Sequence, residues 1–139
     1  MQFKVIKNGF LVRCDIGEEV VSILTEFANQ NNIGSGMVTG IGAVRDPTLG
    51  YFNLESGEYQ RRRFEGIFEL LKLSGNFARL DSKIFLHCHA TISDADFKVF
   101  GGHLFEAEIG VTGEFYIYPG EMVVDRGPDE ATGLNLIKL

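Results

Sequence analysis

The sequence predicts an α+β fold in which one main helix packs on a mostly antiparallel central sheet. Only one segment of the 139 residues repeats its apolar side chains with helical spacing. Almost everything after it consists of short β-branched and aromatic segments separated by turn residues, an order typical of hairpin-connected strands. The length fits one domain, and a chain that is 45% hydrophobic can bury a core without disulfides or structural metals. We therefore expect one compact domain over residues 1–139.

The first predicted elements are a hairpin and the helix. Apolar runs at residues 3–7 and 10–13 flank Asn8-Gly9, a strong hairpin signal. Asp15 then stands three residues before Glu18, which is the spacing of a capping box at the start of a helix. The apolar residues that follow at helical spacing are Val20, Ile23, Leu24, Phe27 and Ala28. Glycines at positions 34 and 36 prevent continuation, so we expect the helix to end near residues 31–32.

Turn residues divide the rest of the chain into strands. They occur at Arg45-Asp46-Pro47, Ser56-Gly57, Ser74-Gly75-Asn76, Ser93-Asp94, Gly101-Gly102, Pro119-Gly120 and Gly127-Pro128. At the first of these, proline presets φ for a turn, so we expect a hairpin connection there.

Two of the predicted strands alternate clearly between apolar and polar residues. Residues 83–93 place Ile84, Leu86, Cys88, Ala90 and Ile92 on one face, and Phe85, His87, His89 and Thr91 on the other. Because side chains alternate along a strand, the first set is predicted to be core and both histidines point away from it. In residues 104–118 the apolar face consists of Phe105, Ala107, Ile109, Val111, Phe115 and Ile117, and the opposite face is acidic.

Charge and composition exclude several classes of protein. With 13 Lys+Arg against 19 Asp+Glu the formal charge is -6, which disfavours a nonspecific DNA binder whose affinity comes from neutralising phosphates. The apolar runs are too short to span a membrane, and the first residues lack the apolar stretch of a signal peptide. Cys14 and Cys88 have no paired spacing and make no disulfide framework, so we expect a cytoplasmic protein.

The chain has three histidines, and all of them lie between residues 87 and 103. His87 and His89 point to the same side of one predicted strand, roughly 7 Å apart at their Cα atoms. His103 follows Gly101-Gly102, a pair that allows a bulge and could bring the third ring to the same place. Three imidazoles with an open fourth position for water or a small molecule are typical of zinc sites, although iron, nickel, copper and cobalt also accept this ligand.

The residues alone leave a second interpretation of these histidines open. A His-x-His pair on an exposed strand can be solvated surface or part of a subunit interface. Simple alternation also places His103 on the apolar face with Phe105, so convergence requires a register shift at the Gly-Gly pair. A divalent transition metal bound by His87, His89 and His103 and a purely structural role are both consistent with this pattern.

Further charged residues stand in positions that need an explanation. In the basic run Arg61-Arg62-Arg63, Arg62 could contact an anion or a partner, but a solvated edge strand explains the run better. Arg45 belongs to a predicted turn, with a contribution to an anion pocket as its second interpretation. Glu69 interrupts the apolar stretch 67–71, where it could act as a general base. We favour the alternative that Glu69 pairs with Arg45 or Lys72 across a subunit contact.

Several motifs together resemble a known family. They are the stretch from Gly40 to Leu49, the stretch from Glu65 to Asn76, the pair His87-x-His89 and the triplet Gly101-Gly102-His103. In this order they are similar to the PPC (plants and prokaryotes conserved) domain, and the resemblance runs from about Gly17 to Leu134. It implies a compact domain with a largely antiparallel sheet that assembles into homotrimers. In prokaryotic members the histidines matching His87, His89 and His103 are associated with a metal, commonly zinc.

Plant members of that family carry AT-hook segments that bind A·T-rich DNA, and the resemblance therefore implies a DNA-binding or regulatory module. This chain contains no AT-hook, and Ile67 replaces the arginine of the plant Gly-Arg-Phe motif. The alternative function is a metal-dependent hydrolase acting on a small substrate, with Glu69, or Glu106 or Glu108, as the base that activates a metal-bound water. The acidic charge favours the enzyme, whereas the resemblance favours the DNA-binding module.

Overall fold

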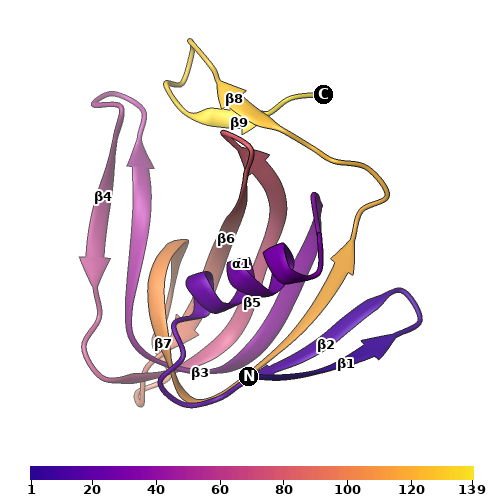
Figure 1. Cartoon of the computed structure of the whole chain (residues 1–139). Coiled ribbons are helices and arrows are strands. Elements are labelled where there is room, and N and C mark those ends of the chain that lie inside the picture. Colours follow the sequence, from indigo (N-terminus) through magenta and orange to yellow (C-terminus); the bar gives the residue numbers. More distant parts are fainter.

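The structure, a computed structural model that describes residues 1–139, contains one helix and a largely antiparallel sheet, as predicted (Figure 1). In chain order the elements are β1 (Gln2–Ile6), β2 (Gly9–Cys14), α1 (Val20–Gln30), β3 (Gly36–Asn53), β4 (Glu58–Arg63), β5 (Ile67–Leu80), β6 (Lys83–Ser93), β7 (Val99–Pro119), β8 (Arg126–Pro128) and β9 (Asn135–Ile137). The main sheet has the strand order β1-β2-β7-β6-β5-β3-β4, and β8 and β9 form a separate hairpin. The α+β prediction is confirmed.

Two long strands give the sheet its shape. β3 pairs with β4, β5 and β7, and β7 also pairs with β2 and β6, so the pairings β7–β6–β5–β3–β7 close on themselves. Figure 1 shows both strands strongly curved, with α1 lying across the sheet. The helix buries Val20, Leu24, Phe27 and Ala28, as its spacing predicts. Phe27 packs edge-on against Phe3 and Phe10 at ring-centroid distances of 5.2 and 5.1 Å, which ties the helix to the first hairpin.

The helix begins later than the predicted capping box places it. Glu18 accepts a hydrogen bond from the Asp15 N–H at 2.8 Å, but this turn precedes the helix. Glu19 is the N-cap, and its carboxylate accepts from the N–H groups of Val21 at 3.1 Å and Ser22 at 2.7 Å. Since a capping carboxylate satisfies two orphan donors at once, Glu19 fixes the helix start.

Three predicted turns lie inside strands. Residues 74–76 belong to β5, residues 101–102 belong to β7, and the predicted hairpin turn at Arg45-Asp46-Pro47 is a bend within β3. Asp46 takes a left-handed φ of 50° at this bend. Its carboxylate accepts from the Gly66 N–H at 2.7 Å and from Arg63 Nη2 at 3.2 Å. These contacts stabilise a conformation that a non-glycine residue adopts at a cost, so the strand bends without ending.

The polypeptide has no helix that combines the length and apolar character needed to cross a membrane.

Candidate metal centre

β6 presents two histidines because its opposite face belongs to the core. Leu86, Cys88 and Ala90 are buried, as the alternation predicts, and His87 and His89 therefore project from the other side of the strand. On β5, Asn76 lies opposite His87 and Ser74 lies opposite His89.

The third histidine reaches the same face through the register of β7. His103 lies directly opposite His89 on β6 and opposite Gly50 on β3. The register between β6 and β7 is regular through Gly101-Gly102, so the shift expected there is absent. It lies instead at Phe105, because Thr48 pairs with Glu106 whereas Leu49 pairs with Leu104. This extra residue reverses the alternation of β7 and places His103 beside the other two rings.

The three side chains lie close enough to share one metal ion. One ring nitrogen from each of His87, His89 and His103 falls within 4.8 Å of the other two. The ring centroids are 5.3, 5.1 and 5.5 Å apart for the pairs 87–89, 87–103 and 89–103. Nδ1 of His103 is buried and has no hydrogen-bond partner. A buried ring nitrogen without a hydrogen-bond partner fits a metal ligand, so the donor set is suitable for a transition metal.

The surroundings favour the neutral form of the His87 and His103 rings. Burial, with smaller contributions from the neighbouring His87 and His89, lowers the pKa of His103 to about 4. Burial also lowers the pKa of His87, with smaller effects from Arg126 and His89. Imidazole must be neutral to donate to a metal, so the lowered pKa values favour the form of these two rings that can bind one at neutral pH.

Arg126, at the start of β8, completes one side of the site. Its Nη2 donates to Asn76 Oδ1 at 2.8 Å and lies 3.2 Å from His87 Nδ1, and its Nη1 donates to the Asn135 carbonyl at 3.1 Å. Because a guanidinium has only donors, His87 Nδ1 is the acceptor in this contact. Sequence reasoning missed Arg126, since nothing in the local pattern around it connects it with the histidines.

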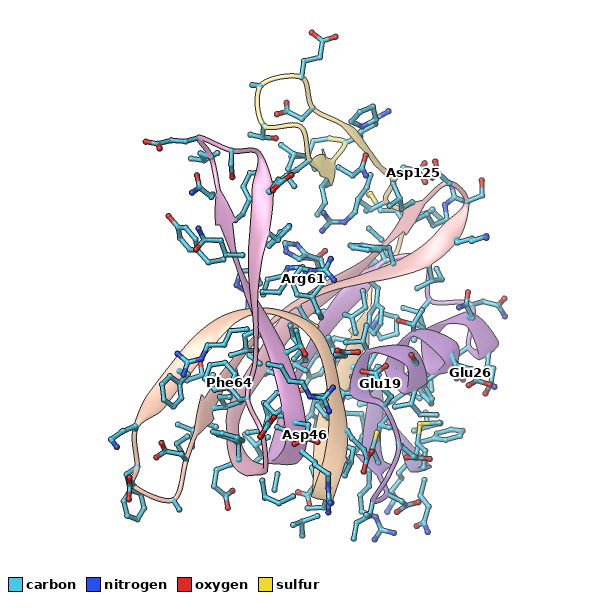
Figure 2. All side chains as sticks on the ribbon, turned by 90° about the vertical axis from the view of Figure 1, so that its left-hand side faces the viewer. Glu19, Glu26, Asp46, Arg61, Phe64 and Asp125 are labelled. Carbon is cyan, nitrogen blue, oxygen red and sulfur yellow. The ribbon has the colours of Figure 1, made fainter.

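A cavity of about 290 Å³ opens beside His87 and His103. Aromatic side chains form one wall: the ring centroids of Tyr59 and Phe105 lie 5.1 and 4.7 Å from that of His103. The Arg61 guanidinium stacks over the Phe105 ring at 3.8 Å, and Figure 2 shows Arg61 pointing inward from β4. None of the residues that line the cavity is acidic.

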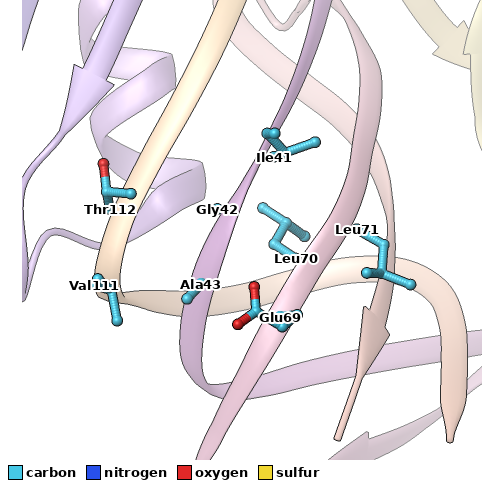
Figure 3. Close-up of a pocket in the computed structure, with 8 residues that line it drawn as sticks. All are labelled: Ile41, Gly42, Ala43, Glu69, Leu70, Leu71, Val111 and Thr112. Atoms are coloured by element: carbon cyan, nitrogen blue, oxygen red, sulfur yellow. The ribbon is translucent and has the colours of Figure 1, made fainter. Parts of the chain in front are cut away.

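The other predicted site residues lie outside this cavity. Glu69 is exposed at a second cavity of about 380 Å³, together with apolar residues that include Ile41, Leu71 and Val111 (Figure 3). Glu69 forms no ion pair within the chain. Arg45 lies 3.8 Å from Glu108. Arg62 packs over the rings of Phe64 and Phe100 instead of entering the histidine cavity.

The chain is similar to known proteins in both sequence and structure. Residues 1–120 match the family model of the Plants and Prokaryotes Conserved (PCC) domain. A protein from Bacteroides thetaiotaomicron, provisionally described as DNA-binding, is 30% identical with a TM-score of 0.95, over 99% of this chain and 96% of that one. A metal-containing protein from Archaeoglobus fulgidus is 38% identical with a TM-score of 0.85, over 97% and 95% of the two chains. A plant- and prokaryote-conserved (PPC) protein from Pyrococcus horikoshii is 31% identical with a TM-score of 0.88, over 99% and 95%. No match is found among curated proteins.

Proposed function

Because the chain belongs to the Plants and Prokaryotes Conserved (PCC) domain family, we propose that it is a metal-binding member in which His87, His89 and His103 hold a divalent transition metal. The observation that carries the proposal is the convergence of three ring nitrogens within 4.8 Å of one another. Zinc is the first candidate, since three imidazoles suit it and leave a coordination position open. The metal-containing relative from Archaeoglobus fulgidus supports the binding of a metal.

The residues around the histidines determine what a metal could do there. A bound divalent metal would supply Lewis acidity at the open position. Tyr59 and Phe105 pack against the ring of His103, and Arg126 lies beside His87. No carboxylate lines the cavity in a single chain, so the hydrolase alternative finds no nearby base there. Metal binding alone is therefore the better supported activity.

Elemental analysis of protein purified without a histidine tag tests this proposal. We expect near-stoichiometric metal in the unaltered protein, and its loss in His87→Ala and His103→Ala. Thr91→Ala is the matched control, because Thr91 lies on the histidine face of β6 but is not a ligand. Unaltered protein that holds no metal, even after incubation with zinc, cobalt or nickel salts, would refute the proposal.

DNA binding is a second candidate function. The description of the Bacteroides thetaiotaomicron relative supports it, and the net charge of -6 opposes it. The arginines of β4 are the only basic run, but the guanidiniums of Arg61 and Arg62 stack on aromatic rings. A salt-sensitive gel shift that is lost when Arg61, Arg62 and Arg63 become alanine would establish DNA binding, whereas a flat titration at low salt would exclude it.

The exposed apolar residues support a homotrimer as the assembled form. Ile41, Leu71 and Val111 are 55%, 46% and 58% exposed and line one cavity with Glu69 (Figure 3). An apolar surface of this kind is typical of a subunit contact. In the trimer, Glu69 would pair with Arg45 or Lys72 of a neighbouring copy. The buried, unpaired Cys14 and Cys88 support a reducing, cytoplasmic location.

A further inference from the structure

The cavity beside the histidines is lined by several segments that do not contribute a proposed metal ligand. Its walls come from distant parts of the chain: β4, the end of β5, β6, the start of β7, Arg126 of β8 and the C-terminal residues 134–136. The last of these, like Arg126, lie beyond residues 1–120, which match the family. The β3–β4 and β8–β9 hairpins extend on the same side of the molecule and flank this region (Figure 1). The cavity therefore combines the histidines of the family with a wall from outside the matched region.

Arg126 is a buried cation without a counter-ion. It is only 9% exposed, and it forms no ion pair. The acceptors it has are Asn76 Oδ1, the Asn135 carbonyl and His87 Nδ1, and none of them is a carboxylate. Its Nε is buried and has no partner at all. A buried charge that is neither paired nor fully hydrogen-bonded is costly, which indicates that an anion belongs beside it.

Arg61 supplies a second cation to the same cavity. Its guanidinium lies 3.8 Å from the centroid of the Phe105 ring and forms no ion pair. Stacking on an aromatic face holds the guanidinium plane while leaving its N–H edge free to donate. Two guanidiniums and no carboxylate make this cavity electropositive within a chain of net charge -6. The positive charge of the cavity itself, rather than the net charge of the protein, determines which ligands it attracts, and it favours anions.

We propose that this cavity binds a small organic carboxylate, with its charged end between Arg126 and Arg61 and its apolar end against the hydrophobic wall. That wall consists of Leu80, Phe85, Phe105, Leu134 and Leu136. A planar carboxylate matches the guanidinium fork with two parallel hydrogen bonds. A cavity of about 290 Å³ is at the lower end of the size of small-molecule sites. Inorganic phosphate would satisfy the cations but would leave the apolar wall uncovered.

The carboxylate site is coupled to the metal centre through His87, and this step rests on the proposed function. A neutral imidazole that donates one nitrogen to a metal carries its proton on the other. His87 can therefore not accept from Arg126 Nη2, as it does in this structure, while it is a metal ligand. Metal binding frees this N–H donor of Arg126 beside the cavity. The metal-loaded protein consequently binds the carboxylate more tightly than the metal-free protein does.

Calorimetric titration with benzoate tests the site. The titration is done on zinc-loaded and on metal-free protein, and the zinc content of each sample is measured. Benzamide, which has the same ring without the charge, and inorganic phosphate are the comparison ligands. We expect benzoate to bind the zinc-loaded protein more tightly than either comparison ligand. Arg61→Gln and Arg126→Gln should each weaken benzoate binding by about tenfold, the loss expected for one charge-assisted pair.

Arg62→Gln is the matched control, because Arg62 neighbours Arg61 on β4 but packs over Phe64 and Phe100. It should leave benzoate binding unchanged. Arg126 also anchors β8 and β9, so the folding of its variant is checked by thermal melting, and Arg61→Gln decides the question if that variant unfolds. Stoichiometric zinc without benzoate binding, or equal binding of benzamide, would overturn the carboxylate site and leave the metal centre intact. Absence of zinc would overturn the metal centre and the coupling, and the titration of metal-free protein would then decide the carboxylate site alone.

Discussion

At the scale of single residues, His103 has the most unfavourable environment of the three proposed ligands. Its ring lies between Tyr59 and Phe105, and its Nδ1 is buried without a partner. An unsatisfied buried polar atom costs about 1–3 kcal/mol. His103→Phe removes this atom and keeps an aromatic ring in the same place. We therefore expect the variant to raise the unfolding free energy of the metal-free protein by about 1 kcal/mol in chemical denaturation.

The same substitution should also abolish the stabilisation that zinc gives, because one ligand is lost. His89→Phe is the control, since His89 is exposed and has no buried ring nitrogen without a partner. It should remove zinc binding without stabilising the metal-free protein. If His103→Phe and the unaltered metal-free protein have equal unfolding free energies, His103 does not destabilise the metal-free protein and the prediction is wrong.

The pKa of His103 predicts a pH dependence for the metal-free protein. Its pKa in the folded state is about 4, against 6.5 for the ordinary side chain. Between these values the unfolded chain binds more protons than the folded chain does, so stability rises with pH in this window. This contribution is complete above pH 6.5 and is lost as the pH falls towards 4. Thermal midpoints measured across the window should fall less steeply in His103→Phe than in the unaltered protein, and parallel curves would contradict the prediction.

At the scale of secondary-structure elements, local patterns predicted where two of the histidines point, but for the third they placed the required register shift at the wrong residues. The alternation in β6 is local, so it placed His87 and His89 correctly on the face opposite the core. The side of β7 that carries His103 depends on the bulge at Phe105, which arises from pairing with β3. Arg126 comes from a segment far along the chain. Contacts between distant segments leave no periodic signal in a single sequence, so neither feature was predictable from it.

Close approach between β7 and β3 holds His103 in place, and one glycine permits it. A Cβ on Gly102 would lie 2.7 Å from the Gly50 carbonyl oxygen, a backbone atom that cannot turn aside. Gly102→Ala should therefore separate the two strands, at a cost of about 1–3 kcal/mol in unfolding free energy, and weaken zinc binding. Gly101→Ala is the control, because its Cβ would meet Ala90 O at 3.3 Å and needs only a small adjustment. Similar losses in both variants, by denaturation and zinc titration, would argue against this role of Gly102.

The bend within β3 depends on Asp46. The Gly66 N–H, and to a smaller extent Arg63, lower the pKa of the Asp46 carboxyl, which shows that the ionised form is the one that is held. Asp46→Ala removes these contacts and keeps the left-handed φ of 50°, whereas Asp46→Gly removes them and relieves the backbone cost. We expect the thermal midpoint of Asp46→Ala to be the lowest of the three proteins. A lower midpoint for Asp46→Gly than for Asp46→Ala would contradict the idea that the left-handed backbone conformation at position 46 is costly and is stabilised by the Asp46 side chain.

At the scale of the whole molecule, the metal centre and the proposed trimer contact use separate surfaces. The histidine cavity lies between β4, β6, β7 and the C-terminal hairpin, whereas Ile41, Leu71 and Val111 line the cavity that contains Glu69. All three histidines converge within a single chain. Assembly is therefore not required to bring the ligands together, and the two properties should be separable by mutation.

A variant that carries both Ile41→Asp and Val111→Asp tests this separation. Charge on two half-exposed apolar positions should convert the proposed trimer to monomers in light scattering coupled to gel filtration, because desolvating a new carboxylate opposes association. The monomer should keep its full zinc content, since its ligands stay within one chain. Val5→Asp is the control: Val5 is 68% exposed on β1, away from the Glu69 cavity, and its substitution should leave the trimer intact. A monomeric variant without zinc would mean that a neighbouring copy completes the site, whereas unaltered protein that is already monomeric would remove the trimer and leave the metal centre untouched.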